Sequence, residues 1–256
     1  MNKSKEPEVE KISPVYHERF KDAMWYDKPL AITIGGAGGI GSWLTLFLSR
    51  VGHEIYLYDH DRVETVNLAG QVYGPSHVGM TKTGAMQAVV TLLCAEAKVN
   101  EMGKFGEGGS TLLTNITFMA FDNMVARKLM AQTWNQMQEK RIEKAKVEGL
   151  YDSPDYVPPI SILIDGRMEA ESGMVFVIKS PSDYERYMKE DMFEDSEVPD
   201  GPCSYKATSH NGARLAAEMM NVLNNHISNK YRKLKYRTVP YKVEYAFPTL
   251  DYEITK

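Results

Sequence analysis

The stretch Leu30–Ser42, LAITIGGAGGIGS, carries the clearest indication of the fold. It opens with the apolar run LAITI, which ends at glycines and predicts a short buried strand. The glycines that follow have the spacing G-x-G-x-x-G, and the candidate phosphate-binding residues are Gly36, Gly38, Gly39 and Gly41. Such glycines allow a tight turn and a close approach of the backbone to phosphate, while the next helix adds amide donors and a favourable dipole. The stretch therefore predicts a strand–turn–helix unit that binds a nucleotide; a glycine turn that binds nothing is the alternative.

The next elements place an acid where a ribose-binding residue belongs. Residues Ser42–Val51 are helix-like, and Glu54–Tyr58 (EIYLY) predicts a second strand. Asp59 follows that strand at about 20 residues from the glycines, the usual distance for an acid that binds ribose hydroxyls.

Strand and helix patterns alternate through the first two-thirds of the chain. Further strands are expected at Asn115–Phe121, Ile160–Ile164 and Gly173–Ile178, and further helices at Lys82–Lys98, Met124–Val147 and Ser209–His226. We expect loops or turns at Lys104–Ser110 and 181–201, and short aromatic strands between Lys235 and Phe247. The pattern predicts an α/β fold, with a Rossmann-like, mostly parallel sheet, helices on both faces and added antiparallel strands in the C-terminal part. We expect residues 1–14 to be a flexible tail and residues 15–256 a single domain.

The bulk properties exclude several classes of protein. A formal net charge of −4 over 256 residues gives no general attraction to nucleic acid or to an anionic membrane. The polar first residues predict no signal peptide, and no stretch approaches the ~18 apolar residues of a membrane span. There are two cysteines, Cys94 and Cys203, and no Cys-x-x-Cys pair, so we expect no zinc site and a reduced, cytoplasmic setting.

Three further blocks of sequence indicate which class of nucleotide-binding protein this is. They are residues 59–71 (DHDRVETVNLAGQ), residues 77–85 (HVGMTKTGA), and Phe121-Asp122-Asn123 followed by Arg127. Together they resemble the signature of the ThiF/MoeB/ubiquitin-activating superfamily, and the second half of the chain resembles phage- or mobile-element-type ThiF-like members. An NAD-dependent oxidoreductase remains a further hypothesis, but it has no reason to carry Asn67, Gln71, Lys82 and Asp122 at these places.

This resemblance implies ATP-dependent adenylation of the C-terminal carboxylate of a ubiquitin-like or sulfur-carrier protein, in a homodimer. Asp59 would bind the ribose, Asn67 and Lys82 the phosphates, and Asp122 would hold Mg²⁺, a hard ion that prefers carboxylate oxygens. The implied nucleotide-binding set is Gly36, Gly38, Gly39, Gly41, Asp59, Asp61, Asn67, Gln71 and Lys82. A simpler alternative for Asp122 is a helix N-cap, and for Arg127 a structural salt bridge.

The chain departs from the family pattern at Gly70, where the family usually has an arginine that faces the triphosphate. Candidate replacements are Arg62, Arg167 and Arg19, the last of these acting in the site of a neighbouring subunit. Because glycine carries no charge, a degenerate module that holds a nucleotide or a partner without turnover is the alternative function.

Cys203 precedes the expected helix that begins at Ser209, a region where thioester-forming relatives place their nucleophile. A thiolate there would be favoured by the helix N-terminus and by Lys206 and His210. The alternative is a small packing residue, which is also what we expect of Cys94 in its apolar run.

Overall fold

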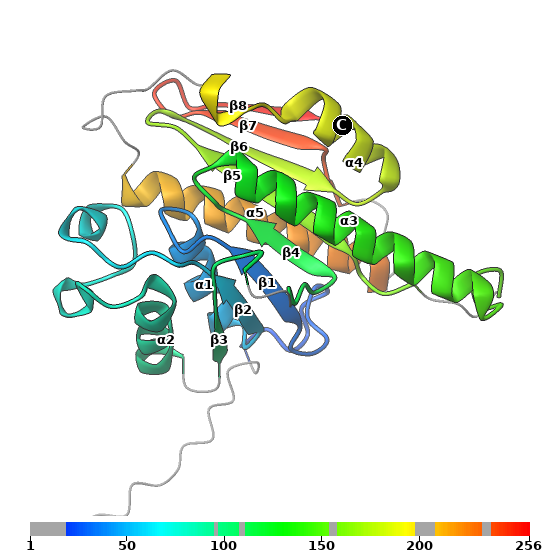
Figure 1. Ribbon diagram of the computed structural model, residues 1–256, viewed down its shortest axis with the longest axis horizontal. Helices are drawn as coiled ribbons and strands as arrows, with labels where there is room; N and C mark the ends of the chain where they lie inside the picture. Colours follow the sequence, from blue (N-terminus) through cyan, green and yellow to red (C-terminus); the bar gives the residue numbers. More distant parts are fainter. Residues whose placement is uncertain (1–18, 95–96, 108–110, 154–157, 198–207, 232–236) are drawn as a thin grey trace, which may run out of the picture.

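The computed structural model describes residues 19–94, 97–107, 111–153, 158–197, 208–231 and 237–256. Its strands are β1 Ala31–Gly35, β2 Glu54–Tyr58, β3 Lys98–Gly103, β4 Ile116–Met119, β5 Ile162–Met168, β6 Ser172–Ile178, β7 Lys242–Ala246 and β8 Asp251–Thr255. Its α-helices are α1 Gly41–Arg50, α2 Lys82–Leu93, α3 Met124–Val147, α4 Pro181–Arg186 and α5 Ser209–Tyr231. All the strands join one sheet in the order β3-β2-β1-β4-β5-β6-β7-β8 (Figure 1).

The sheet is parallel from β3 to β5 and antiparallel from β5 to β8. Ile32 pairs with Ile55 on one side and Ile116 on the other, so β1, β2 and β4 end at the same edge. The loops at that edge carry the candidate site, as expected for an open α/β sheet. This arrangement confirms the predicted fold class.

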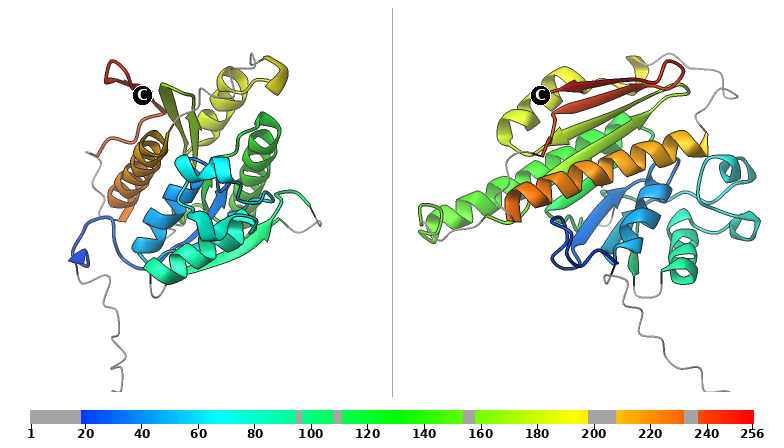
Figure 2. Two further views of the ribbon diagram at one scale, coloured as in Figure 1. Left: turned by 90° about the vertical axis from the view of Figure 1, so that its left-hand side faces the viewer. Right: turned by 180° about the vertical axis from the view of Figure 1, so that it is seen from behind.

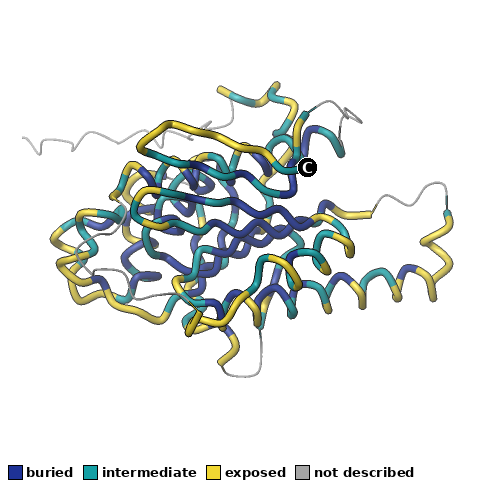
Figure 3. Tube along the Cα trace, turned by 90° about the horizontal axis from the view of Figure 1, so that it is seen from above, coloured by how far each residue is buried: buried dark blue, intermediate teal, exposed yellow. Residues whose placement is uncertain are grey.

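Helices cover both faces of the sheet (Figure 2). Helices α1, α2 and α5 pack on the face that presents Ile32, Ile34 and Phe118, while α3 and α4 cover the face with Met119 and Leu163. Burial on both faces explains the near-continuous apolar strands of the centre, which form the dark blue middle of Figure 3.

Several predicted elements differ from the observed ones in their bounds, and two segments differ in kind. Helix α2 ends at Leu93, and residues Lys98–Gly103 form the edge strand β3, whose polar sequence KVNEMG suits a partly exposed strand better than a buried one. Part of the segment expected to be irregular is helical: Pro181 begins α4, and the Ser180 side chain accepts a hydrogen bond from the Asp183 amide as its N-cap.

The expected tail, residues 1–14, lies outside the described residues. None of the helices in the described ranges combines the length with the apolar character that a membrane-crossing helix needs.

Candidate functional site

The glycine loop between β1 and α1 has a backbone path that only glycine permits. Gly36 has a φ of +93°, and a Cβ there would lie 2.5 Å from the carbonyl oxygen of Ala120. A Cβ at Gly41 would overlap the carbonyl oxygen of Gly36. At Gly38, by contrast, a Cβ would meet nothing within 4 Å, so the loop is open on that side.

The open side of the loop carries unused hydrogen-bond donors. Within the described residues, the amides of Gly38, Gly39 and Ile40 donate to no protein acceptor, although the neighbouring amides of Gly36 and Ala37 do. Helix α1 begins here with no acidic residue in its first turn. Free amides at a helix N-terminus are a favourable place for a phosphate group.

Asp59 holds the loop in this shape. Its Oδ2 accepts the Ala37 amide at 2.7 Å, and its Oδ1 accepts the Asp61 amide at 2.8 Å. Burial raises the pKa of Asp59, while the nearby Lys82 charge and the two amides act in the opposite direction. A carboxylate has about four lone-pair sites, so Asp59 keeps acceptor capacity for ribose hydroxyls.

Tyr73 is a site residue that the sequence did not reveal. Its buried hydroxyl donates to the carbonyl oxygen of Ala37 at 2.7 Å and lies 3.4 Å from that of Lys82. Asp59 and Tyr73 therefore bind the amide and the carbonyl of the same residue. The available signal was weak: a buried tyrosine needs a hydrogen-bond partner, and Tyr73 follows Gln71 by two positions.

Lys82 lies at the start of α2 and is buried. Its Nζ is 2.8 Å from Asp61 Oδ2, and this bond lowers the pKa of Asp61. Arg62 follows Asp61 in the chain and is exposed, and one of its guanidinium N–H groups donates to the Gly79 carbonyl at 2.7 Å. The structure thus brings Asp59, Asp61 and Lys82 together beside the glycine loop, whereas the Arg62 guanidinium contacts Gly79.

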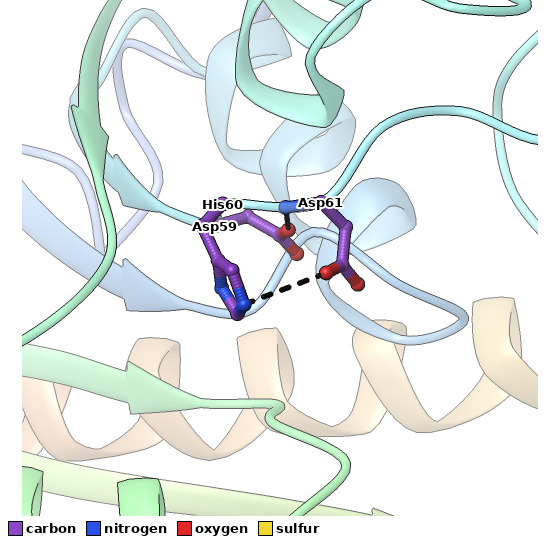
Figure 4. A group of neighbouring side chains, drawn as sticks. All are labelled: Asp59, His60 and Asp61. Atoms are coloured by element: carbon purple, nitrogen blue, oxygen red, sulfur yellow. Dashed lines mark hydrogen bonds and ion pairs between the residues drawn. The ribbon is translucent and has the colours of Figure 1, made fainter.

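Asp59, His60 and Asp61 converge at the end of β2 (Figure 4). One ligand atom from each lies within 4.8 Å of the others, and His60 Nε2 is 3.7 Å from Asp61 Oδ1. Exposed acidic groups of this kind are common without a metal ion, so the cluster by itself identifies no site.

Asn67 and Gln71 lie in the loop between β2 and α2. Asn67 Oδ1 accepts the Glu64 amide at 2.8 Å and so caps a 3₁₀ turn, while Gln71 Oε1 is buried without a partner among the described residues. Gly70 has φ −116° and ψ −19°, which any residue can adopt, and its carbonyl accepts the Trp43 indole N–H at 3.2 Å. The backbone therefore does not require glycine where the family has arginine.

Asp122 is exposed after β4, at the same sheet edge. The N-cap of α3 is Asn123, whose side chain accepts the Ala126 amide at 2.8 Å and donates to Asp122 Oδ1 at 3.1 Å. The alternative interpretation of Asp122 as the helix cap is therefore wrong, and the carboxylate faces solvent.

Arg127 and Arg167 are held in a closed cluster around Asp165. Arg127 pairs with Asp165 and donates to the carbonyls of Phe121 and Gly166. Arg167 Nε lies 2.7 Å from Asp165 Oδ2, which also accepts the Tyr187 hydroxyl at 2.7 Å. These contacts are those of structural residues and argue against the catalytic role predicted for Arg167.

The other candidates lie apart from this group. The segment 19–30, which contains Arg19, precedes β1 and so approaches the sheet from the edge opposite the glycine loop (Figure 1). Cys94 is buried at the end of α2, where burial raises its pKa, as a packing residue would be. Cys203 lies outside the described residues.

The sequence matches the family model described as the ThiF family over residues 28–247. Two curated relatives are named Ubiquitin-like modifier-activating enzyme 5. The one from Oryza sativa subsp. japonica is 42% identical over 77 residues, which are 30% of this chain and 16% of the relative. The one from Arabidopsis thaliana is 42% identical over 66 residues, 25% of this chain and 15% of the relative. The match thus spans about a sixth of the length of these relatives.

Solved structures with the same fold include E. coli MccB with ATP and the protein PaaA. For MccB with ATP the TM-score is 0.61 at 17% identity, over 88% of this chain and 62% of that one. MccB with MccA-N7isoASN gives a TM-score of 0.62 at 15% identity, over 92% and 66%. PaaA gives 0.58 at 17% identity, over 94% and 66%. At these identities the likeness shows the fold.

Proposed function

The chain belongs to the ThiF family, and from that premise we propose that it binds ATP at the glycine loop and adenylates a carboxylate of a protein or peptide. One observation carries this proposal: unused amides at the N-terminus of α1 stand beside a buried lysine and an acid in the ribose position. The structure of MccB with ATP, a neighbour of the same fold, supports the choice of nucleotide.

The described residues suit an in-line transfer. The substrate carboxylate attacks the α-phosphorus, a new C–O–P bond forms, and pyrophosphate leaves with the electrons of the broken P–O bond. The amides of Gly38 and Gly39 would bind phosphate oxygens, Lys82 would neutralise their charge, and Asp59 would hold the ribose. Asp122 offers exposed carboxylate oxygens that suit Mg²⁺, and such an ion supplies further charge neutralisation when bound.

Arg62 is our candidate for the charge that Gly70 lacks. It lies next to Asp61, and one of its guanidinium N–H groups is engaged by the Gly79 carbonyl, which leaves other donors of the fork for phosphate. Arg127 and Arg167 have their donors committed around Asp165.

The names of the similar proteins suggest which carboxylate substrate the chain would adenylate. The name of the curated relatives supports a ubiquitin-like substrate, and a sulfur-carrier protein would present a similar terminal carboxylate. A structure of MccB in complex with N-formylated MccA makes a peptide-sized substrate the alternative. We extend the proposal to a homodimer that works in the cytoplasm, with transfer to Cys203 as a second step.

A degenerate binding module is the rival function, because Gly70 removes the family arginine. Pyrophosphate exchange into ATP, with a candidate carboxylate substrate present, separates the two functions, since only an adenylating enzyme catalyses it. In parallel, ATP with Mg²⁺ at about 100 times its dissociation constant should add roughly 2.7 kcal/mol and raise the unfolding midpoint by about 5–10 °C. The rise in unfolding midpoint should disappear in Asp59→Ala. A rise with NAD and none with ATP would contradict the proposal.

A further inference from the structure

The first turn of α5 packs against the glycine loop without clearance. A Cβ added at Gly212 would overlap the carbonyl oxygen of Gly39 and lie 3.0 Å from its carbonyl carbon, where real Cβ atoms essentially never come closer than 3.0 Å. It would also lie 3.6 Å from Trp43 Cδ1. The obstructing atoms at Gly39 are backbone, so no side-chain rotation can make room.

Residues of β5 also pack against the loop. A Cβ added at Gly39 would lie 2.9 Å from Met168 Cε, and one at Gly166 would lie 3.4 Å from Ile40 Cδ1. The buried side chain of Asn211 donates to the Ala170 carbonyl at 3.4 Å and ties the first turn of α5 to the β5–β6 turn. The Gly39 carbonyl thus lies against α5, and the neighbouring Gly39 Cα and Ile40 side chain lie against β5.

The contact sets the direction of one phosphate-facing donor. In a planar trans peptide the C=O and the following N–H point in opposite directions. With the Gly39 carbonyl against α5, the Ile40 amide points away from α5, and it has no protein acceptor in the described chain. We propose that Gly212 is a positioning residue for the phosphate-binding loop, an inference that rests on the nucleotide-binding part of the proposed function.

Gly212→Ala tests this directly, with Gly173→Ala as the matched control. A Cβ at Gly173 would lie 2.7 Å from Leu215 Cδ1, so it disturbs the same helix through a flexible side chain and leaves the loop alone. A displacement of the loop by about 1 Å should weaken ATP·Mg²⁺ binding by about 10- to 100-fold in Gly212→Ala. We expect the control to keep the native dissociation constant with a similar fall in unfolding midpoint. Equal dissociation constants in the two variants would overturn the proposal.

Amide hydrogen exchange in the ligand-free chain separates this inference from the proposed function. We expect the amides of residues 38–42 to exchange faster in Gly212→Ala than in the native chain and in Gly173→Ala. If the native chain binds no ATP, the proposed function fails, and the exchange rates still decide whether Gly212 positions the loop. If Gly212→Ala does not fold, Asn211→Ala releases the same turn; unchanged loop exchange in that variant would refute the coupling.

Discussion

Two charged clusters flank the sheet edge, and they use the same residue types in opposite ways. In one, Lys82 pairs with Asp61, whose side chain remains 47% exposed, and the exposed Arg62 follows Asp61 in the chain. In the other, Asp165 is fully buried and receives Arg127, Arg167 and the Tyr187 hydroxyl. The open cluster can accept a ligand without first breaking a network, whereas the closed cluster stabilises the fold. Both clusters carry charge, and what distinguishes them is whether their hydrogen-bond donors and acceptors are already paired within the protein.

Asp165→Asn should have the largest effect, because it removes the central carboxylate of the closed cluster. The substitution leaves the buried Arg127 and the half-buried Arg167 without a counter-charge, so we expect a loss of about 3–5 kcal/mol in unfolding free energy and a midpoint lower by roughly 10 °C. Urea unfolding measures the loss, with the exposed Asp152→Asn as control. A change below about 1 kcal/mol would mean that Asp165 is not the hub of a closed cluster.

Lys82→Met tests the open cluster. Because Asp61 is half exposed, we expect stability to change by no more than about 1 kcal/mol, while pyrophosphate exchange falls by about 10²- to 10³-fold. Lys98→Met is the control: it removes an ion pair of similar length made by a more exposed lysine, Lys98 Nζ to Glu54 Oε1 at 2.7 Å, at the opposite end of β2. If both variants lose activity equally, Lys82 has no special relation to the nucleotide.

Tyr73→Phe tests whether the hydrogen bond from Tyr73 to the glycine loop supports nucleotide binding. The change removes the buried donor to the Ala37 carbonyl, which should cost about 1–3 kcal/mol in stability. Because Ala37 then loses one of the two side-chain bonds that fix it, nucleotide affinity should fall as well. Calorimetric titration measures the affinity, with the exposed Tyr252→Phe as control. Native affinity in Tyr73→Phe would show that the loop keeps its shape without the Tyr73 bond.

The sequence was sufficient for features that depend on neighbouring residues. The strand Glu54–Tyr58 and the helix Met124–Val147 were predicted at their observed bounds, because an apolar run and an uninterrupted series of helix formers are local signals. The glycine loop and Asp59 come together as their spacing predicted. Strand β3 was missed because an edge strand with one exposed face lacks an apolar run.

The sequence was insufficient where the outcome depends on packing between distant segments. Arg62 and Arg167 were equal candidates by spacing, and only the folded chain buries Arg167 against Asp165 and the Phe176 ring. Tyr73 could not be assigned, because its partner Ala37 lies in another element and offers only backbone atoms. The contact of Gly212 with Gly39 is likewise invisible in the sequence, since it joins the two ends of the domain.

The smallest effect concerns the pKa of Asp59 and shows how far the open cluster is coupled. Burial raises this pKa in the folded chain, and the Lys82 charge opposes that rise. A carboxyl whose pKa is raised on folding binds more protons in the folded state, so its contribution to stability falls as the pH rises from the unfolded pKa through the folded one. In Lys82→Met the opposing charge is gone, and we expect the pKa of Asp59 to rise further. The pH range over which the Asp59 contribution to stability is lost should then extend to higher pH. Carboxyl ¹³C NMR titration measures it, with Lys98→Met expected to match the native chain. A pKa in Lys82→Met at or below the native one would mean that Lys82 and Asp59 are not electrostatically coupled, and that the open cluster does not act as one unit.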